Sequence, residues 1–164
     1  MQIRFVAATL VALFAAAASA AADKTEGRPA PATLPAPAEG QGQVLFWRSG
    51  TVVGGGMGCG VNIGKERISA LGAGHYFILP LPPGAHQFNA KSEAKDVLNV
   101  EVKPGETSYV KCTIKMGIMV GRPNLSPSTA EEYEKKRGDL KYVDSDDIGA
   151  KVMPDPSPAV AATP

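Results

Sequence analysis

Residues 97–116 read VLNVEVKPGETSYVKCTIKM, two runs of alternating apolar and polar residues on either side of Pro104-Gly105. Alternation with a period of two is typical of β-strands that bury one face. Proline presets φ at the first central position of a type II turn, and glycine accepts the positive φ that follows. The stretch therefore predicts two strands, 97–102 and 108–116, joined by a tight turn.

Similar short runs extend this pattern through the middle of the chain. They predict five further strands, at 44–48, 57–63, 67–71, 75–79 and 85–90. Pro83-Gly84 suits a second type II turn, and Gly64-Lys65 and Gly72-Ala73-Gly74 suit hairpin loops. Seven short strands separated by glycine and proline indicate a mainly β fold, an antiparallel two-sheet sandwich.

One short helix is predicted after the last strand, near 129–137. Ser128 and Glu131 form a capping box, and Gly138 stands where a C-terminal cap belongs. The apolar face of this helix is thin, because it consists of Ala130 and Tyr133. We therefore expect the helix to lie on the surface of the sandwich.

The first 20 residues have the order of a cleavable export signal. A positive charge at Arg4 precedes an apolar stretch over 5–17 and the small residues Ala18-Ser19-Ala20. The alternative is an uncleaved helix. The signal predicts cleavage near Ala20 and a periplasmic or secreted protein. The nearest cysteine is Cys59, so no lipid anchor is predicted, and no later stretch is apolar enough for a transmembrane segment.

Both flanks of the β-rich region are rich in proline and small residues. The segment 21–42 is predicted to be a disordered linker and 144–164 a disordered tail, which leaves 43–143 as the domain. The chain has 17 basic and 16 acidic residues, and removal of Arg4 with the signal would leave 16 of each. This balance argues against a nucleic-acid partner.

The run 43–115 carries a series of motifs in a recognisable order. These are Val44-Leu45-Phe46-Trp47-Arg48, Val61-Asn62-Ile63-Gly64, Leu71 through Gly74 to Tyr76, Leu81-Pro82-Pro83-Gly84-Ala85-His86 and Pro104-Gly105-Glu106-Thr107-Ser108-Tyr109-Val110. In this order they resemble a bacterial envelope family catalogued as domain of unknown function 2846. The resemblance implies an Ig-like or PEGA-like sandwich in an exported protein, and it supplies no catalytic residues. Many relatives look like lipoproteins, whereas this chain lacks their cysteine.

The two cysteines are Cys59 and Cys112, and an oxidising compartment favours a disulfide between them. Strand parity places Cys59 with Val61 and Cys112 with Val110, so both side chains should point into the core. Parity does not give the Cα separation, so two separate buried thiols are the alternative.

Two groups of residues are candidates for an interaction surface. Trp47 and Arg48 belong to residue types favoured at interfaces, although Trp47 in the core and Arg48 at the sheet edge are the alternative. The glycines Gly54, Gly55, Gly56 and Gly58 form a loop whose exposed backbone a partner could use. A phosphate loop would need Ser or Thr directly after its lysine, whereas Lys65 is followed by Glu66. The alternative for the glycine-rich stretch is a flexible loop or a bulged strand edge.

No metal site, cofactor or catalytic group is predicted. His75 and His86 are too far apart along a hairpin to share a metal, and Met116 and Met119 suit a core better than a copper site. No Gly-x-Ser-x-Gly elbow is present. The sequence therefore predicts a non-enzymatic envelope module that binds a protein or a glycan, with a small-ligand carrier or an unrecognised enzyme as the alternative.

Overall fold

The computed structural model describes residues 30–31, 33–51, 55–90, 97–115 and 121–156. The predicted signal peptide, Gly54, Met116 and Met119 lie outside the described residues. Among the residues described, no helix is long and apolar enough to span a membrane.

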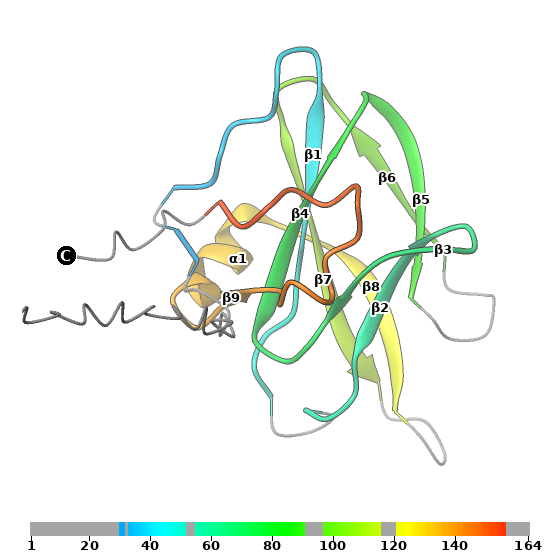
Figure 1. The fold of residues 1–164 in the computed structure, drawn as a ribbon, viewed down its shortest axis with the longest axis vertical. Helices are drawn as coiled ribbons and strands as arrows, with labels where there is room; N and C mark the ends of the chain where they lie inside the picture. Colours follow the sequence, from blue (N-terminus) through cyan, green and yellow to red (C-terminus); the bar gives the residue numbers. More distant parts are fainter. Residues whose placement is uncertain (1–29, 32, 52–54, 91–96, 116–120, 157–164) are drawn as a thin grey trace, which may run out of the picture.

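The chain forms two β-sheets packed face to face, with one short helix on the outer side of the larger sheet (Figure 1). The five-stranded sheet has the order β8 (Arg122–Ser128), β7 (Thr107–Lys115), β1 (Gly42–Trp47), β4 (His75–Leu81) and β9 (Lys141–Tyr142). The four-stranded sheet has the order β3 (Glu66–Leu71), β2 (Cys59–Ile63), β5 (Gly84–Ala90) and β6 (Val97–Val102). The mainly β sandwich predicted from the alternation is confirmed.

Nine strands are present among the described residues where seven were predicted, and two of the pairings are parallel. β1 pairs with β7 and β4 pairs with β9 in parallel, so the expectation of a purely antiparallel sandwich is wrong. The additional strands are β8 and β9. β8 contains Pro123 and Pro127, which do not suggest a strand but are tolerated at a sheet edge, where the missing N–H groups need no partner.

The connections between strands also differ from the prediction. Gly64-Lys65 forms the predicted hairpin between β2 and β3, with Gly64 at a φ of 59°. The Gly72-Ala73-Gly74 segment forms no hairpin, because β3 and β4 belong to different sheets. The same holds for Pro83-Gly84, which carries the chain from β4 in one sheet to β5 in the other. Gly105 has the positive φ, 73°, that the predicted turn requires.

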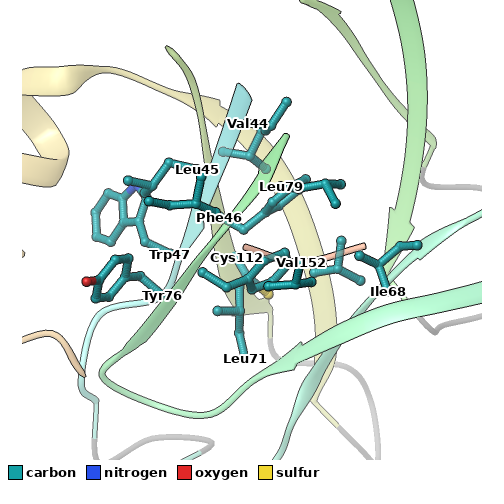
Figure 2. Packing of buried hydrophobic residues seen from close by; sticks show 14 of the residues in the cluster. Val44, Leu45, Phe46, Trp47, Ile68, Leu71, Tyr76, Leu79, Cys112 and Val152 are labelled. Carbon is teal, nitrogen blue, oxygen red and sulfur yellow. The ribbon is translucent and has the colours of Figure 1, made fainter. Parts of the chain in front are cut away.

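All six residues of β1 are buried, because both faces of this strand are covered. Phe46 points toward the four-stranded sheet, where its ring lies 5.0 Å from that of Phe88 in β5 between ring centroids. It also stacks on Phe77 of the neighbouring strand β4, with the ring centroids 4.9 Å apart. Trp47 points the other way, toward the helix, as the alternation along the strand requires (Figure 2). A strand buried on both sides reads as a continuous apolar run, here Val44 to Trp47.

The helix α1 (Ala130–Arg137) lies where it was predicted, with a different N-cap. Thr129 is the cap, since its Oγ1 accepts a hydrogen bond from the backbone N–H of Glu132 at 3.2 Å. Ser128 cannot cap, because it is still the last residue of β8, paired with Tyr109. Tyr133 is fully buried and anchors α1 on the outer face of the five-stranded sheet.

The described parts of both flanks pack against the sandwich, so the prediction that they are disordered is wrong for these residues. Before β1, the N–H of Ala30 donates to the carbonyl of Leu140, and Leu34 packs against the core. After β9, the N–H of Gly149 donates to the carbonyl of Ile68 and the N–H of Met153 to that of Ile78. The folded unit therefore extends through residue 156.

The proline content of the tail, residues 144–164, suggested disorder, whereas apolar residues of its described part pack against the sandwich. Val143 and Val152 are buried, and Ile148 forms a β-bridge with Ser69 of β3. Main-chain bonds to Ile68 and Ile78 place the tail along β3 and β4, one strand from each sheet. A segment with such anchors is ordered by tertiary contacts that its local composition does not report.

We expect Gly149→Ala to release this tail. A methyl group at position 149 would collide with the main-chain oxygen of Ile68, so the substitution should lower the free energy of unfolding by about 1–3 kcal/mol. Denaturant unfolding and amide hydrogen exchange of 148–153 would measure the effect. Gly138→Ala is the control, because a methyl group there meets no atom within 4 Å. Unchanged exchange in Gly149→Ala would contradict the docking.

Candidate functional site

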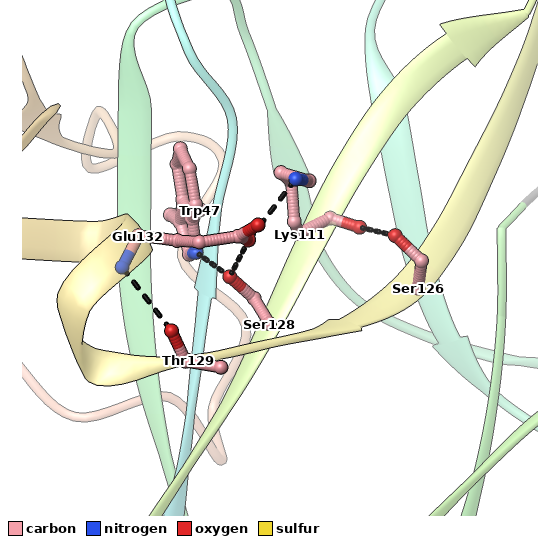
Figure 3. Close-up of polar contacts among 6 residues, drawn as sticks. All are labelled: Trp47, Lys111, Ser126, Ser128, Thr129 and Glu132. Atoms are coloured by element: carbon pink, nitrogen blue, oxygen red, sulfur yellow. Dashed lines mark hydrogen bonds and ion pairs between the residues drawn. The ribbon is translucent and has the colours of Figure 1, made fainter. Parts of the chain in front are cut away.

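Trp47 lies in the core beneath α1, so its proposed role in an interaction surface is wrong. Only 3% of the residue is exposed, and its ring packs edge-on against Tyr133 at 6.3 Å between centroids. The indole Nε1 donates to Ser128 Oγ at 3.2 Å, and Lys111 Nζ stands 5.7 Å from the ring centroid (Figure 3). The alternative interpretation, Trp47 as core, is therefore correct.

The indole takes part in a polar network that joins three strands to the helix. Ser128 Oγ donates to Glu132 Oε2 at 2.7 Å, and Lys111 Nζ lies 3.0 Å from the same oxygen (Figure 3). The Ser128 hydroxyl and then Lys111 hold the pKa of the Glu132 carboxyl below its ordinary value. The network thus orients the start of α1 over β1 and β7.

Arg48 is also buried, with 2% of the residue exposed, and its guanidinium binds main-chain carbonyls. Nη1 donates to the carbonyl oxygens of Met57 and Leu71, the latter at 3.2 Å. Burial lowers the pKa of Arg48, but a guanidinium stays charged in proteins. Through these hydrogen bonds Arg48, which directly follows β1, holds the segment before β2 and the end of β3 in place. Arg48 is therefore a buried structural residue rather than a surface residue.

Beside Arg48 lies a pocket of about 260 Å³, formed with Ser49, Thr51, Cys112, Thr113 and Ile114. It stands at the end of β1, next to the sulfur of Cys112. Its small volume is below the roughly 300–1,000 Å³ of a ligand pocket. We assign it no ligand.

Of the four glycines predicted to form an interaction loop, three are described. Gly55, Gly56 and Gly58 are exposed, and a Cβ added at Gly56 or Gly58 would meet no atom within 4 Å. They are therefore open to solvent, but no side chain with a ligand-binding group converges on them among the described contacts. Their interaction role stays a prediction, and Gly54 lies outside the described residues.

Cys59 and Cys112 form a disulfide with an S–S distance of 2.06 Å and a Cα separation of 6.7 Å. The bond joins β2 of the four-stranded sheet to β7 of the five-stranded sheet. The prediction from strand parity is confirmed, and the alternative of two buried thiols is not. The disulfide fixes the two sheets to each other near the pocket at Arg48.

The two histidines lie on strands of different sheets rather than on one hairpin. A ring nitrogen of His75 lies 3.0 Å from the carbonyl oxygen of Ala73, and one of His86 lies 2.8 Å from that of Pro82. Within the described ranges, no group of three or more His, Cys, Asp or Glu side chains is arranged to hold a metal ion.

A groove of about 530 Å³, which the sequence did not indicate, opens between the two sheets beside α1. Its walls come from β6, the start of β7, the end of β8 and the first residues of α1. The lining residues are Asn99, Val100, Glu101, Thr107, Ser108, Tyr109, Val110, Pro127, Ser128, Thr129, Ala130 and Glu131. They belong to segments separated along the chain, so no local motif marks them.

The groove exists because β8 ends before it reaches the first residues of β7, with which it pairs in antiparallel. Ser128, the last residue of β8, pairs with Tyr109, and the chain then turns into α1. Thr107 and Ser108 at the start of β7 therefore pair with β1 on one side and have no β8 residue on the other. Across the groove, Ser108 Oγ donates to the carbonyl oxygen of Glu101 in β6 at 3.3 Å.

The groove carries negative charge. Glu101 and Glu131 are its two acidic lining residues, and the described lining residues include no lysine, arginine or histidine. Burial first, and then Glu134 and Glu131, raise the pKa of the Tyr109 hydroxyl. The hydroxyl of Thr129 is the main cause that lowers the pKa of Glu131, which favours the charged form. The potential in the groove thus suits a positively charged ligand.

β6 also differs from the other edge strands in how its edge is protected. β8 carries Pro123 and Pro127, β9 has only two residues, and the tail pairs with β3 at Ser69. Each is a known way to prevent a further strand from adding to a sheet. β6, in contrast, contains neither proline nor lysine. On the side away from β5, no further described strand lies next to it in the sheet, and Val97 is 49% exposed.

Comparison with known protein families, curated proteins and solved structures found no match to this chain. The resemblance of 43–115 to the envelope family therefore remains a prediction from the motifs.

Loss of the disulfide should destabilise the sandwich without changing its strands. Cys59→Ala combined with Cys112→Ala removes a link between residues 53 apart in sequence and should cost about 2–4 kcal/mol of unfolding free energy. Denaturant unfolding of the variant and of the reduced protein should give similar losses. Peptide mass analysis without reductant provides the direct check, and two free thiols in the protein purified under oxidising conditions would contradict the bond.

Glu132→Gln should lower stability at neutral pH and have less effect in acid. The folded state lowers the pKa of this carboxyl, so its contribution is present above the ordinary glutamate pKa and is lost as the pH falls through the lowered value. Urea unfolding at pH 7 and pH 3 tests this. The control is Glu106→Gln, whose exposed carboxylate lies 3.8 Å from Lys103. An equal effect of Glu132→Gln at both pH values would refute the network.

Proposed function

We propose that this protein is a non-enzymatic interaction module of the bacterial cell envelope and that it binds a protein partner in the groove beside β6. The observation that carries the proposal is an edge strand, β6, that pairs with no second strand among the described residues and lies next to an open groove of about 530 Å³. Proteins generally block such edges, because a free edge pairs readily with other chains. A folded domain that blocks its other edges and leaves one open has a surface suited to binding.

The hydroxyl groups of the groove support binding rather than catalysis. Ser108 donates to a main-chain carbonyl, and Ser128 bonds to both Trp47 and Glu132. A nucleophilic serine needs a general base within hydrogen-bond reach, and the carboxylate that accepts from Ser128 is a weak base, because Glu132 is paired with Lys111 and its pKa is lowered. These hydroxyls stabilise the fold instead.

The alternative, a carrier with a ligand pocket between the sheets, has less support. At the centre of the sandwich, the stacked rings of Phe46 and Phe77 and the edge of Phe88 occupy the space that such a pocket would need. All three residues are fully buried. The groove lies at the margin of the sandwich, where a partner reaches it without opening the core.

The envelope location rests on two features. The export signal with cleavage near Ala20 predicts a periplasmic or secreted protein, and the motifs of 43–115 resemble an envelope family. The disulfide between Cys59 and Cys112 is compatible with an oxidising compartment. In that setting the proposed partner is another envelope protein.

Site-specific photo-crosslinking in the native envelope tests this proposal. A photoreactive residue at Val97, on the open edge, should give a protein adduct that protease digestion removes. The same residue at Arg122, exposed on the proline-containing edge of β8, is the matched control and should give much less. Equal adducts at both positions, no adduct at Val97, or an adduct that resists protease and contains glycan would each contradict the proposal.

A further inference from the structure

The partner that the groove fits can be described in chemical terms, given the proposed function. The first element of the fit is the main chain of β6. As an edge strand, β6 directs N–H and C=O groups of alternate residues away from β5, where no further described strand receives them. An extended segment placed at the usual spacing of about 4.8 Å would hydrogen-bond to these groups.

The second element is the space beside this edge. The side chains of Thr107, Ser108, Ser128 and Thr129 are short, and they leave the groove open between β6 and the start of α1. The bond from Ser108 Oγ to the carbonyl of Glu101 occupies one edge acceptor. A carbonyl oxygen has two lone pairs, so an incoming main-chain N–H can bond to the same oxygen beside this hydroxyl. Strand addition is therefore compatible with the groove.

The third element is charge. Glu101 and Glu131 stand on opposite walls of the groove, one on β6 and one on α1. Two nearby lysines are paired elsewhere, since Lys103 lies 3.8 Å from Glu106 and Lys111 lies 3.0 Å from Glu132. A basic side chain of the occupant would meet Glu101 and Glu131, of which Glu131 also interacts with Lys135 of α1.

A second copy of this chain fits less well than a basic segment. Pairing of β6 with β6 of another molecule would add a second Glu101 to the groove region. The sequence of β6, VLNVEV, supplies no positive charge to offset it. Like charges across a pairing are destabilising, so self-association is disfavoured.

We infer that the groove binds an extended, basic peptide segment of its partner, which pairs with β6 as an added fifth strand of the four-stranded sheet. Main-chain hydrogen bonds to β6 hold the segment, and Glu101 and Glu131 select its lysine or arginine side chains. This inference rests on the proposed function and names the chemical class of the ligand. Tyr109 lies against the segment from the floor of the groove.

Fluorescence anisotropy with the mature, full-length protein and three labelled eight-residue peptides tests the inference. The first peptide alternates lysine with valine or threonine, the second has glutamate in place of lysine, and the third is the first with its two central residues replaced by proline. We expect the first to bind at least tenfold more tightly than either of the others. Proline removes donors and cannot continue a strand pairing, and glutamate is repelled.

Matched variants of the protein locate the binding. Glu101→Gln should weaken the lysine peptide several-fold and reduce its dependence on salt. Glu66→Gln, the same change on β3 at the opposite edge of that sheet, where Glu66 pairs with Lys151, should leave binding unchanged. Equal effects of the two variants would overturn the assignment of the site.

The outcomes separate this inference from the proposed function. If Val97 forms a protein adduct in the envelope but the lysine peptide does not bind, the peptide chemistry is wrong and the interaction surface stands. Equal affinity for the proline peptide would overturn strand addition, and equal affinity for the glutamate peptide would overturn the selection for basic segments. A concentration-dependent dimer that protects Val97 would show that a second copy is the occupant and would also overturn the inference.

Discussion

The need to bury both faces of β1 organises this protein. Val44 and Phe46 require cover on one side and Leu45 and Trp47 on the other, and all four are at most 3% exposed. The four-stranded sheet covers the first side through Phe88, and α1 covers the second through Tyr133. Each buried aromatic side chain contributes on the order of 2–3 kcal/mol relative to an exposed one, so neither cover is dispensable.

The groove is a consequence of this requirement. To bring Tyr133 over Trp47, the chain must leave the five-stranded sheet at Ser128 and begin α1 at Ala130. The bond from the indole to Ser128 Oγ marks the point of departure. Because β8 stops there, Thr107 and Ser108 at the start of β7 pair with β1 but with no residue of β8. Completion of the core on one side of β1 thus opens the surface that we propose for binding.

Much of the secondary structure followed from local patterns. Alternation in 97–102 and 108–116 identified β6 and β7, and strand parity placed both cysteines in the core. The helix was found from its capping residues, one position away from the true cap at Thr129. The tail was misjudged, because its prolines indicated disorder while Val152 and the N–H of Gly149 bind the sandwich. Such anchors depend on a surface that exists only after folding.

The sequence by itself determined seven of the nine described strands, which of their side chains alternate inward, and that the two cysteines share the core. Those properties depend on the period with which apolar and polar residues alternate along the chain. Only the tertiary structure decided that Trp47 and Arg48 are buried, that β1 and β7 pair in parallel, and that Glu101 and Glu131 face one groove. These facts depend on which distant strands become neighbours, and a local pattern carries no information about that choice.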